Sequence, residues 1–239
     1  MGDRYSRQIA FNGIGEDGQK KLYAARVCIV GLGALGTAAA DRLSRAGVGV
    51  LRLIDDDSVD LSNLQRQTLY SEAVIGLTKL DAAARRLREI NSGIEIDTHK
   101  CRLDAENATF LLRDCDVVLD CTDNIAARHV INEACHAQKV PWVNGAAAGS
   151  AGTVFAVVPN GACFRCLYPD NNITGEAADT LGMLGTLTGI VGALQANEAI
   201  KLIVGSKPAG LMMFDIWHNA FEFIQIERNP DCPVCGGGR

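Results

Sequence analysis

The strongest constraint on the fold is a glycine-rich turn, residues 31–36, that separates a short apolar run from an alanine-rich segment. Residues 27–30 have the composition of a buried strand, and residues 35–46 carry polar side chains at helical spacing. Residues 50–54 form a second strand-like run, so the unit has the length of one strand–helix–strand crossover. Because such a crossover joins parallel strands, the sequence predicts a parallel sheet.

Helix and strand patterns keep alternating as far as about residue 145. Helices are expected over 78–91, 105–113 and 124–138, and strands over 94–99, 116–121 and 140–144. Repeated alternation of this kind is typical of an open, doubly wound sheet with helices on both faces. The expected fold class is therefore α/β, with a Rossmann-like, mostly parallel sheet.

Farther along the chain, strands are no longer joined by full helical crossovers. Residues 152–158 and 211–226 have strand character, the second run being split near His218, and a helix is expected over 187–204. Strands without crossover helices favour antiparallel pairing, so we expect antiparallel C-terminal strands that extend the sheet. Residues 168–185 hold proline, asparagine and several glycines and are expected to form a long loop.

Length and composition set limits on domain number and on partners. With 239 residues and 48% hydrophobic content, we expect a single domain over 1–239, divided into a nucleotide-binding half, 1–145, and a second half, 146–239. The 23 basic and 28 acidic residues give a net charge of −5 without a basic run, so nucleic acid is not an expected partner. The first ten residues lack the apolar core of a secretory signal, which favours the cytoplasm. Residues 140–164 are uncharged but too often interrupted by proline, glycine and asparagine for a membrane helix, so we expect two buried strands there and no membrane partner.

The glycine turn itself predicts a nucleotide. Gly31, Gly33 and Gly36 match the pattern G-x-G-x-x-G between a strand and a helix, where glycine lets the backbone approach a phosphate and the helix amides point at the anion. Asp55, at the end of the next strand, can accept hydrogen bonds from both ribose hydroxyls. The motif alone would favour NAD or FAD, and a pure packing role for the glycines is the structural alternative. The neighbouring residues must decide the chemistry.

Cationic and amide side chains follow the acid closely. Asn63, Arg66 and Lys79 would place an amide, a guanidinium and an ammonium near one phosphate site. Adenylation by ATP needs such groups, because negative charge builds on the departing pyrophosphate. Surface positions on a solvated turn are the alternative for each residue taken singly.

Asp123 comes directly after the buried strand that includes Asp120. At the carboxyl edge of a sheet a carboxylate can hold Mg²⁺ together with phosphate oxygens. The structural alternative is an N-cap of the helix that starts near Asn124. Asp120 itself is expected to be buried and structural.

The nine cysteines fall into two groups. Cys28, Cys101, Cys115, Cys121 and Cys135 are scattered and are expected to be small core residues. The other four form two C-x-x-C pairs, Cys163 with Cys166 and Cys232 with Cys235. Four thiolates in such pairs suit a structural, tetrahedral Zn²⁺ that clips the C-terminal tail to the loop after the strand at 152–158. A thioredoxin-like redox pair and zinc-free surface thiols are the alternatives.

Taken together, these motifs resemble the MoeB/ThiF/HesA family, relatives of ubiquitin-activating enzymes, over nearly the whole chain. The motifs that carry the resemblance are R-Y-S-R-Q-I at 4–9, the glycine turn, Asp55 with S-N-L-Q-R-Q at 62–67, Lys79, and C-T-D-N at 121–124. The resemblance implies that Asp55 binds the ribose, that Asn63, Arg66 and Lys79 bind the triphosphate, and that Asp123 binds magnesium. It also implies a homodimer in which Arg7 reaches the ATP site of the other subunit.

The resemblance implies an enzyme, an adenylyltransferase. Using ATP, it would adenylate the C-terminal glycine carboxylate of a small ubiquitin-fold sulfur carrier ending in Gly-Gly, and it would release pyrophosphate. The half at 146–239 would bind the carrier and hold the zinc tail. No enzyme nucleophile is needed, because the carrier's own carboxylate attacks the α-phosphate. A separate protein would donate any sulfur, in molybdopterin, thiamine, tRNA-thiolation or cysteine-type pathways.

Two positions depart from the family pattern. Ala178 stands where the ThiF-like branch has a loop cysteine that bonds to the carrier, and Thr180 replaces a usual glutamate. The missing thiol favours the MoeB or HesA type, which adenylates without a covalent enzyme thiol in this loop. A peptide-carboxylate-activating enzyme of the same family, an NAD-dependent oxidoreductase and an inactive nucleotide-binding scaffold are the alternatives.

Overall fold

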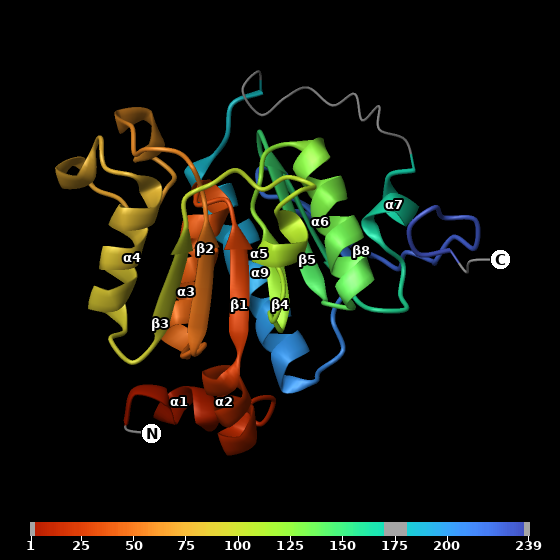
Figure 1. Ribbon diagram of the computed structural model, residues 1–239, viewed down its shortest axis with the longest axis horizontal. Coiled ribbons are helices and arrows are strands. Elements are labelled where there is room, and N and C mark those ends of the chain that lie inside the picture. The colour runs from red at the N-terminus through yellow and green to blue at the C-terminus, as the bar shows by residue number, and fades with distance from the viewer. Residues whose placement is uncertain (1–2, 170–180, 237–239) are drawn as a thin grey trace.

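One eight-stranded sheet runs through the computed structural model, which describes residues 3–169 and 181–236 (Figure 1). Its strands are β1 Arg26–Val30, β2 Val50–Ile54, β3 Glu95–His99, β4 Val117–Asp120, β5 Trp142–Ala148, β6 Ala151–Val157, β7 Leu211–Asp215 and β8 Ala220–Ile224. In the order β3-β2-β1-β4-β5-β6-β7-β8, the first five strands are parallel and the last three pair antiparallel. The predicted α/β fold with antiparallel C-terminal strands is confirmed.

Helices cover both faces of this sheet (Figure 1). The helices are α1 Ser6–Ile9, α2 Gly15–Ala24, α3 Ala34–Ala46, α4 Lys79–Ile90, α5 Ala108–Leu111, α6 Ile125–Gln138, α7 Phe164–Leu167 and α9 Gly185–Val204, with short 3-10 turns at Asp3–Tyr5, Leu61–Asn63 and Glu72–Val74. In the figure, α5 and α6 lie in front of the sheet and α3 and α9 lie behind it. The termini of α3, α4, α6 and α9 fall within a few residues of the predicted ones.

The prediction of a helix over 105–113 is wrong, because only the single turn α5 is helical there. Asp104 Oδ1 accepts hydrogen bonds from the backbone N–H groups of Glu106 and Asn107, at 2.9 and 3.0 Å. A side chain that satisfies these amides stabilises a turn in place of the first helical residues. Helix α2 was not predicted, since Leu22 is its only large apolar side chain in the core and a helical pattern is barely visible.

Alternate residues of the central strands point into two separate cores. Val27 and Ile29 of β1 pack with the side chains of α3, α4 and α9, whereas Cys28 and Val30 pack with those of α5 and α6. This period of two with both faces apolar is typical of a sheet covered on both sides. The scattered cysteines are buried as expected, except for Cys101, which is half-buried.

Helix α9 is the central helix of the first core. In the described part of the chain it is the one helix long and apolar enough to cross a membrane by length and composition alone. It packs along α3, and a side chain at Gly192 would meet the Leu35 carbonyl oxygen at 2.6 Å, so the two helices lie in close contact. This packing accounts for its apolar character. Residues 140–164, set aside above as a membrane helix, contain β5 and β6.

The order of the strands creates a crevice at one edge of the sheet. The chain leaves β1 for α3 on one face and leaves β4 for α6 on the other face, so the loops after these neighbouring strands diverge. Ligands of open α/β sheets lie in such a crevice at the carboxyl ends of the strands. The boundary drawn at residue 145 falls inside β5, and the two halves therefore share one continuous sheet.

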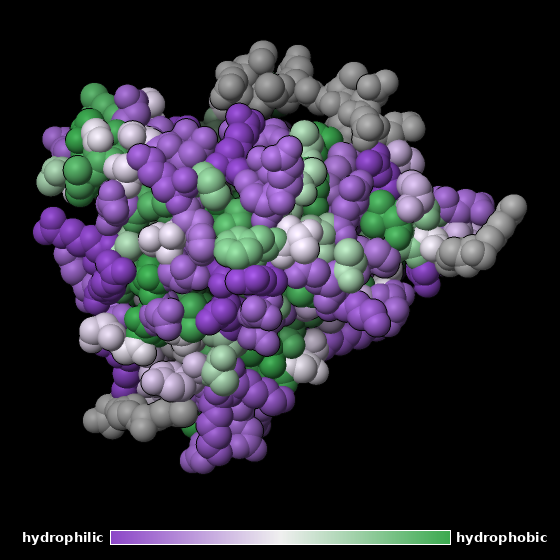
Figure 2. All heavy atoms as spheres, viewed as in Figure 1, coloured by the Kyte–Doolittle hydropathy of each residue, from purple (hydrophilic) through white to green (hydrophobic). Residues whose placement is uncertain are grey.

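The surface seen in Figure 2 is mostly hydrophilic, with small apolar areas. One of them, at the upper left, covers the segment between β2 and α4, where Leu61, Ile75 and Leu77 are exposed. This segment also carries Asn63 and Arg66, two of the predicted site residues.

Candidate functional site

A cleft of about 1030 Å³ opens at the carboxyl ends of the parallel strands. It brings together most of the predicted site residues: Gly31, Gly33, Asp55, Asn63, Arg66, Lys79 and Asp123. Gly36 is buried in the first turn of α3 and does not line the cleft, and Arg7 lies elsewhere. Residues distant in the sequence thus meet at the place where the topology predicts a ligand.

The glycine turn is fixed by close backbone packing. Gly31 has a φ of +91°, and a Cβ there would lie 2.8 Å from the carbonyl oxygen of Cys121. At Gly36 a Cβ would collide with the carbonyl oxygen of Gly31. Gly33, the N-cap of α3, has an ordinary φ of −77° and open space around the Cβ position. Two of the glycines are therefore required by the fold, whereas at Gly33 only the approach of a ligand would require the residue.

Asp55 connects the end of β2 to this turn. Its Oδ2 accepts a hydrogen bond from the Leu32 N–H at 2.6 Å, and its Oδ1 accepts one from the Asp57 N–H at 2.9 Å. Burial raises the pKa of Asp55 above its ordinary value of 3.8, although the Leu32 amide opposes the shift. The carboxylate is thus held at the cleft wall beside the first residues of the turn.

The predicted phosphate-binding side chains are held in place by neighbouring groups. Lys79 Nζ lies 2.6 Å from Asp57 Oδ2, and Arg66 Nη1 donates to the Ser62 carbonyl oxygen at 2.9 Å. Asn63 Oδ1 accepts the N–H of Asp60 at 3.1 Å as part of a capping box. The amide nitrogen of Asn63 keeps both of its donors available to a ligand among the described residues. Two cations and an amide therefore line the cleft.

Asp123 is exposed in the cleft and has no hydrogen bond or ion pair with any described residue. The N-cap of α6 is its neighbour Asn124, whose side chain accepts the Ala127 N–H at 2.8 Å. The capping alternative for Asp123 is therefore wrong. An unpaired carboxylate beside two cations and an amide fits the oxygen ligands that magnesium takes.

Asp120 is fully buried, as predicted, and holds the loop that carries Asp123. Its carboxylate accepts hydrogen bonds from the Thr122 hydroxyl at 2.6 Å and from Asn144 Nδ2 at 2.7 Å. Burial raises the pKa of Asp120, an effect that the nearby Arg128 guanidinium opposes. These contacts fix the direction in which the chain leaves β4.

Two residues that help to build the cleft were missed in the sequence. Arg128 on α6 lines the cleft and donates to the Thr122 carbonyl oxygen at 3.2 Å, and its Nε lies 3.5 Å from Asp120 Oδ2. Gln195, buried on α9, donates to the Asp120 carbonyl oxygen at 2.7 Å. The visible signal for Gln195 was an amide side chain within a largely apolar helix. For Arg128 it was the position one turn into a helix, where side chains lean toward the N-terminus.

Arg7 is exposed on α1, at the opposite edge of the sheet from the cleft (Figure 1). Helix α1 rests on the C-terminal ends of α3 and α4, because Gln8 donates to the Ala46 carbonyl oxygen and Tyr5 accepts a hydrogen bond from Asn91. Arg7 is therefore a predicted ATP-site residue that the structure leaves far from the cleft of its own chain. Ala178 and Thr180 lie outside the described residues.

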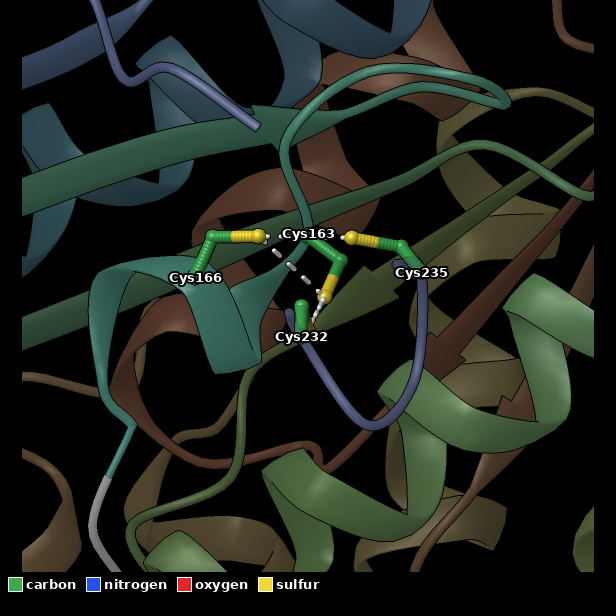
Figure 3. A group of neighbouring side chains, drawn as sticks. All are labelled: Cys163, Cys166, Cys232 and Cys235. Atoms are coloured by element: carbon green, nitrogen blue, oxygen red, sulfur yellow. Dashed lines mark hydrogen bonds between the residues drawn. The ribbon is translucent and has the colours of Figure 1, made fainter. Parts of the chain in front are cut away.

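The four paired cysteines converge on one point (Figure 3). Cys163 and Cys166 lie at the start of α7 and within it, and Cys232 and Cys235 come from the C-terminal tail. All four Sγ atoms lie within 4.8 Å of one another, and the Cys163–Cys232 and Cys166–Cys235 pairs are 3.6 and 3.3 Å apart. Sulfur atoms bound to one tetrahedral zinc ion at about 2.3 Å are about 3.8 Å apart. The cluster could therefore hold zinc, and it joins the tail to the segment after β6 as expected.

Comparison with known proteins identifies close relatives. The sequence model of the ThiF family matches residues 5–234. The molybdopterin-synthase adenylyltransferase of Escherichia coli is 46% identical over 98% of this chain and 96% of that protein. The ThiS adenylyltransferase of the same organism is 44% identical over 98% and 95%, and the SAMP-activating enzyme E1 of Haloferax volcanii is 39% identical over 99% and 89%.

Solved structures of similar fold include E. coli MccB in complex with MccA-N7isoASN. Its TM-score to this chain is 0.87, with 25% sequence identity over 99% of this chain and 76% of MccB. MccB thus shares the fold described above, although its sequence identity to this chain is lower than that of the three relatives.

Proposed function

The chain belongs to the ThiF family and is an adenylyltransferase, and we propose that it uses ATP to adenylate the C-terminal glycine carboxylate of a small ubiquitin-fold carrier protein. The names of its relatives support such a substrate, because ThiS is a sulfur carrier protein. The similar identities of 46% and 44% to the molybdopterin-synthase and ThiS enzymes of one organism do not distinguish between their carriers. Because the chain is an adenylyltransferase, the alternative of an NAD-dependent oxidoreductase is set aside.

The observation that carries this proposal is the distribution of charge in the cleft. Arg66 and Lys79 line it together with the exposed carboxylate of Asp123, and the Gly31–Gly36 turn opens α3 beside them. A helix N-terminus and two fixed cations suit a triphosphate, and a free carboxylate suits its magnesium ion. We assign the ribose to Asp55, which is held on the same wall.

In the proposed reaction, a carboxylate oxygen of the carrier forms a bond to the α-phosphorus of ATP. The bond from that phosphorus to the oxygen bridging to the β-phosphate breaks, and pyrophosphate leaves with its electrons. Arg66, Lys79 and the amide of Asn63 meet the charge that develops on the pyrophosphate, and their existing contacts hold them in position beforehand. Magnesium, held by Asp123, would neutralise further charge on the phosphates. No side chain of the enzyme needs to act as a nucleophile.

Small residues leave a path for the carrier's tail. The end of β5 supplies Gly145 and Ala146–Ala148, and the start of β6 supplies Ala151 and Gly152, all of which line the cleft. An extended chain without bulky side chains, such as a Gly-Gly end, can lie against such a wall. This path supports a carrier-binding role for the half at 146–239.

We further propose a homodimer in which Arg7 enters the partner's cleft, a structural zinc ion at the four cysteines, and a cytoplasmic location. The position of α1 supports the role of Arg7, because the side chain cannot serve its own cleft from the opposite edge of the sheet. The sulfur atoms support zinc by their mutual distances. Any sulfur that follows adenylation would come from a separate protein.

The test is ATP–pyrophosphate exchange by the purified chain with candidate carriers from the same genome. We expect exchange that requires a carrier ending in Gly-Gly, is lost when the last glycine is deleted, and falls about 100-fold or more in Asp123→Ala. Arg66→Ala and Lys79→Ala should retain part of it. Asp17→Asn is the control, because Asp17 is an exposed acid outside the cleft.

The outcome against this proposal is a wild-type protein that exchanges with none of the carriers. Exchange supported by short peptides and by no carrier would favour the peptide-activating alternative instead. Full exchange by Asp123→Ala would leave adenylation in place and remove the assigned role of this carboxylate.

A further inference from the structure

The lining of the cleft includes two chemically different groups of side chains. One group consists of the cations and the amide of the proposed triphosphate site. The other group is apolar and consists of Val30, Ile54 and Leu103, with exposed fractions of 3%, 1% and 7%. These three side chains belong to the core beneath α5 and α6. The cleft wall is therefore apolar at these three positions.

Arg102 lies beside this apolar wall. It follows β3, lines the cleft, and is exposed. Its guanidinium has no hydrogen bond or ion pair with any described residue, whereas the other cations of the cleft are held by protein groups. Arg102 is thus the one cation lining the cleft, within the described ranges, whose side chain is left for a ligand.

The backbone of Arg102 is nevertheless fixed. Its carbonyl oxygen accepts a hydrogen bond from Asn107 Nδ2 at 2.9 Å, and Asn107 Oδ1 accepts the Asp104 N–H at 3.0 Å. With the two amides that Asp104 Oδ1 accepts, these bonds hold the turn after β3 in one shape. The side chain therefore starts from a defined point at the edge of the cleft.

The strand order gives the direction of a bound nucleotide. The end of β3 lies next to the end of β2, where Ile54 pairs with His99, and β2 lies next to β1. With neighbouring strands about 4.8 Å apart, the end of β3 is about 10 Å from the glycine turn. A nucleotide whose phosphates lie at the turn and whose ribose lies at Asp55 would place its base near Arg102.

We propose that Arg102 stacks its guanidinium on the purine base of the nucleotide, with Val30, Ile54 and Leu103 against the rest of the ring. A flat aromatic ring suits a wall that combines apolar side chains with a free guanidinium, because a planar, weakly hydrated guanidinium stacks well on π-systems. The identity of the nucleotide as ATP rests on the proposed function. The assignment of its base end rests on the wall, the free cation and the strand order.

The test separates the two ends of the ligand. Dissociation constants are measured for ATP, adenosine and inorganic tripolyphosphate with the wild-type chain, Arg102→Ala and Arg102→Met. Loss of the stacking contact should weaken ATP and adenosine by the same factor, about tenfold, and leave tripolyphosphate unchanged. At saturating ATP, kcat for exchange should stay at the wild-type value, because the base is remote from the reacting phosphorus.

Arg113→Ala is the matched control, since Arg113 is exposed near the same turn, lies over the Phe110 ring and does not line the cleft. Equal melting temperatures of all variants would show that binding, and not folding, has changed. Weaker tripolyphosphate with unchanged adenosine would overturn the proposal in favour of a phosphate contact, and unchanged binding of all three ligands would overturn it outright. A chain that binds ATP through Arg102 but shows no exchange with any carrier would refute adenylation and leave this assignment standing.

Discussion

At the scale of single residues, burial and the proposed ligand favour opposite protonation states of Asp55. Its carboxylate is held at the cleft wall by the amides of Leu32 and Asp57, and burial raises its pKa. The ionised form is the one that can accept hydrogen bonds from both ribose hydroxyls. Folding therefore favours the protonated form, whereas the proposed ligand favours the charged form.

This conflict predicts two pH dependences of opposite sign. For an acid with a raised folded-state pKa, the stabilising contribution is fully present below the ordinary value of 3.8 and is lost as pH rises through the folded pKa. As pH falls from neutral, stability from Asp55 should rise while ATP affinity falls. In Asp55→Asn both of these contributions should vanish, and ATP affinity near neutral pH should drop about tenfold or more.

Chemical denaturation and ATP titration over the same pH series check this prediction. Titration of ATP's own phosphates is common to both proteins, so the informative quantity is the difference between wild type and Asp55→Asn. The same pH profile of ATP affinity in the two proteins would contradict the role of Asp55. A comparable series with Asp17→Asn controls for general effects of removing one acid, because Asp17 is exposed.

At the scale of secondary-structure elements, the contact between α3 and α9 depends on small side chains. A Cβ at Gly192 would lie 2.6 Å from the Leu35 carbonyl oxygen and 2.8 Å from Ala38 Cβ, both in α3. Neither neighbour can rotate away, because one is backbone and the other is a side chain without rotamers. The close contact in turn brings the Gln195 amide, on the same helix, to the carbonyl oxygens of Asp120 at the end of β4 and of Val143 near the start of β5.

Gly192→Ala should therefore lower the free energy of unfolding by about 1–3 kcal/mol. Gly189→Ala is the matched control in the same helix, since a Cβ there meets nothing within 4 Å. That control should be neutral or stabilising, by up to about 1 kcal/mol, because alanine has the higher helix propensity. Equal effects of the two substitutions in urea unfolding would show that the helices are not in tight contact at Gly192.

The cysteine cluster joins the C-terminal tail to the segment after β6, so its loss should mainly destabilise this tail. Cys232→Ser should abolish the binding of about one zinc ion per chain, expose the tail to proteases and lower the melting temperature by about 5 °C. Cys101→Ser is the control, because Cys101 is a half-buried thiol outside the cluster. A wild-type protein that binds no zinc and forms a reversible Cys163–Cys166 disulfide would favour the redox alternative.

Most elements could be predicted from the sequence, because periodicity and glycine position report local structure and burial directly. Helix α5 could not, since the competition between the Asp104 side chain and the helical amides is decided by a few hydrogen bonds. At the site, the sequence motifs identified Asp55 and Asp123, but Arg102 and Arg128 carry no motif in the sequence. Their positions in the cleft depend on the path of the turn after β3 and on the direction of α6.

At the scale of the whole molecule, the cleft lies at the carboxyl ends of the parallel strands and α1 lies near their amino ends (Figure 1). Helix α1 is tied to the ends of α3 and α4 by Gln8 and Tyr5, and the five residues of β1 span about 17 Å between its two ends. An arginine side chain cannot bridge that distance. If Arg7 takes part in adenylation, it must do so in the cleft of another subunit, so its role requires a homodimer.

Mixing two inactive variants tests this arrangement. Arg7→Ala would supply an intact cleft without a partner's arginine, and Asp123→Ala would supply the arginine without an intact cleft. Each homodimer should be inactive, whereas a heterodimer holds one complete site of two, because the Arg7→Ala cleft receives Arg7 from the Asp123→Ala subunit. After random reassociation of equal amounts, half of the dimers are mixed, and exchange should return to about a quarter of the wild-type value. If Arg7 served its own cleft, the mixed dimer would contain no complete site and mixing would restore nothing. Equal activity of Arg7→Ala and wild type would refute a role of Arg7 in adenylation. The oligomeric state would then have to be measured directly, by sedimentation.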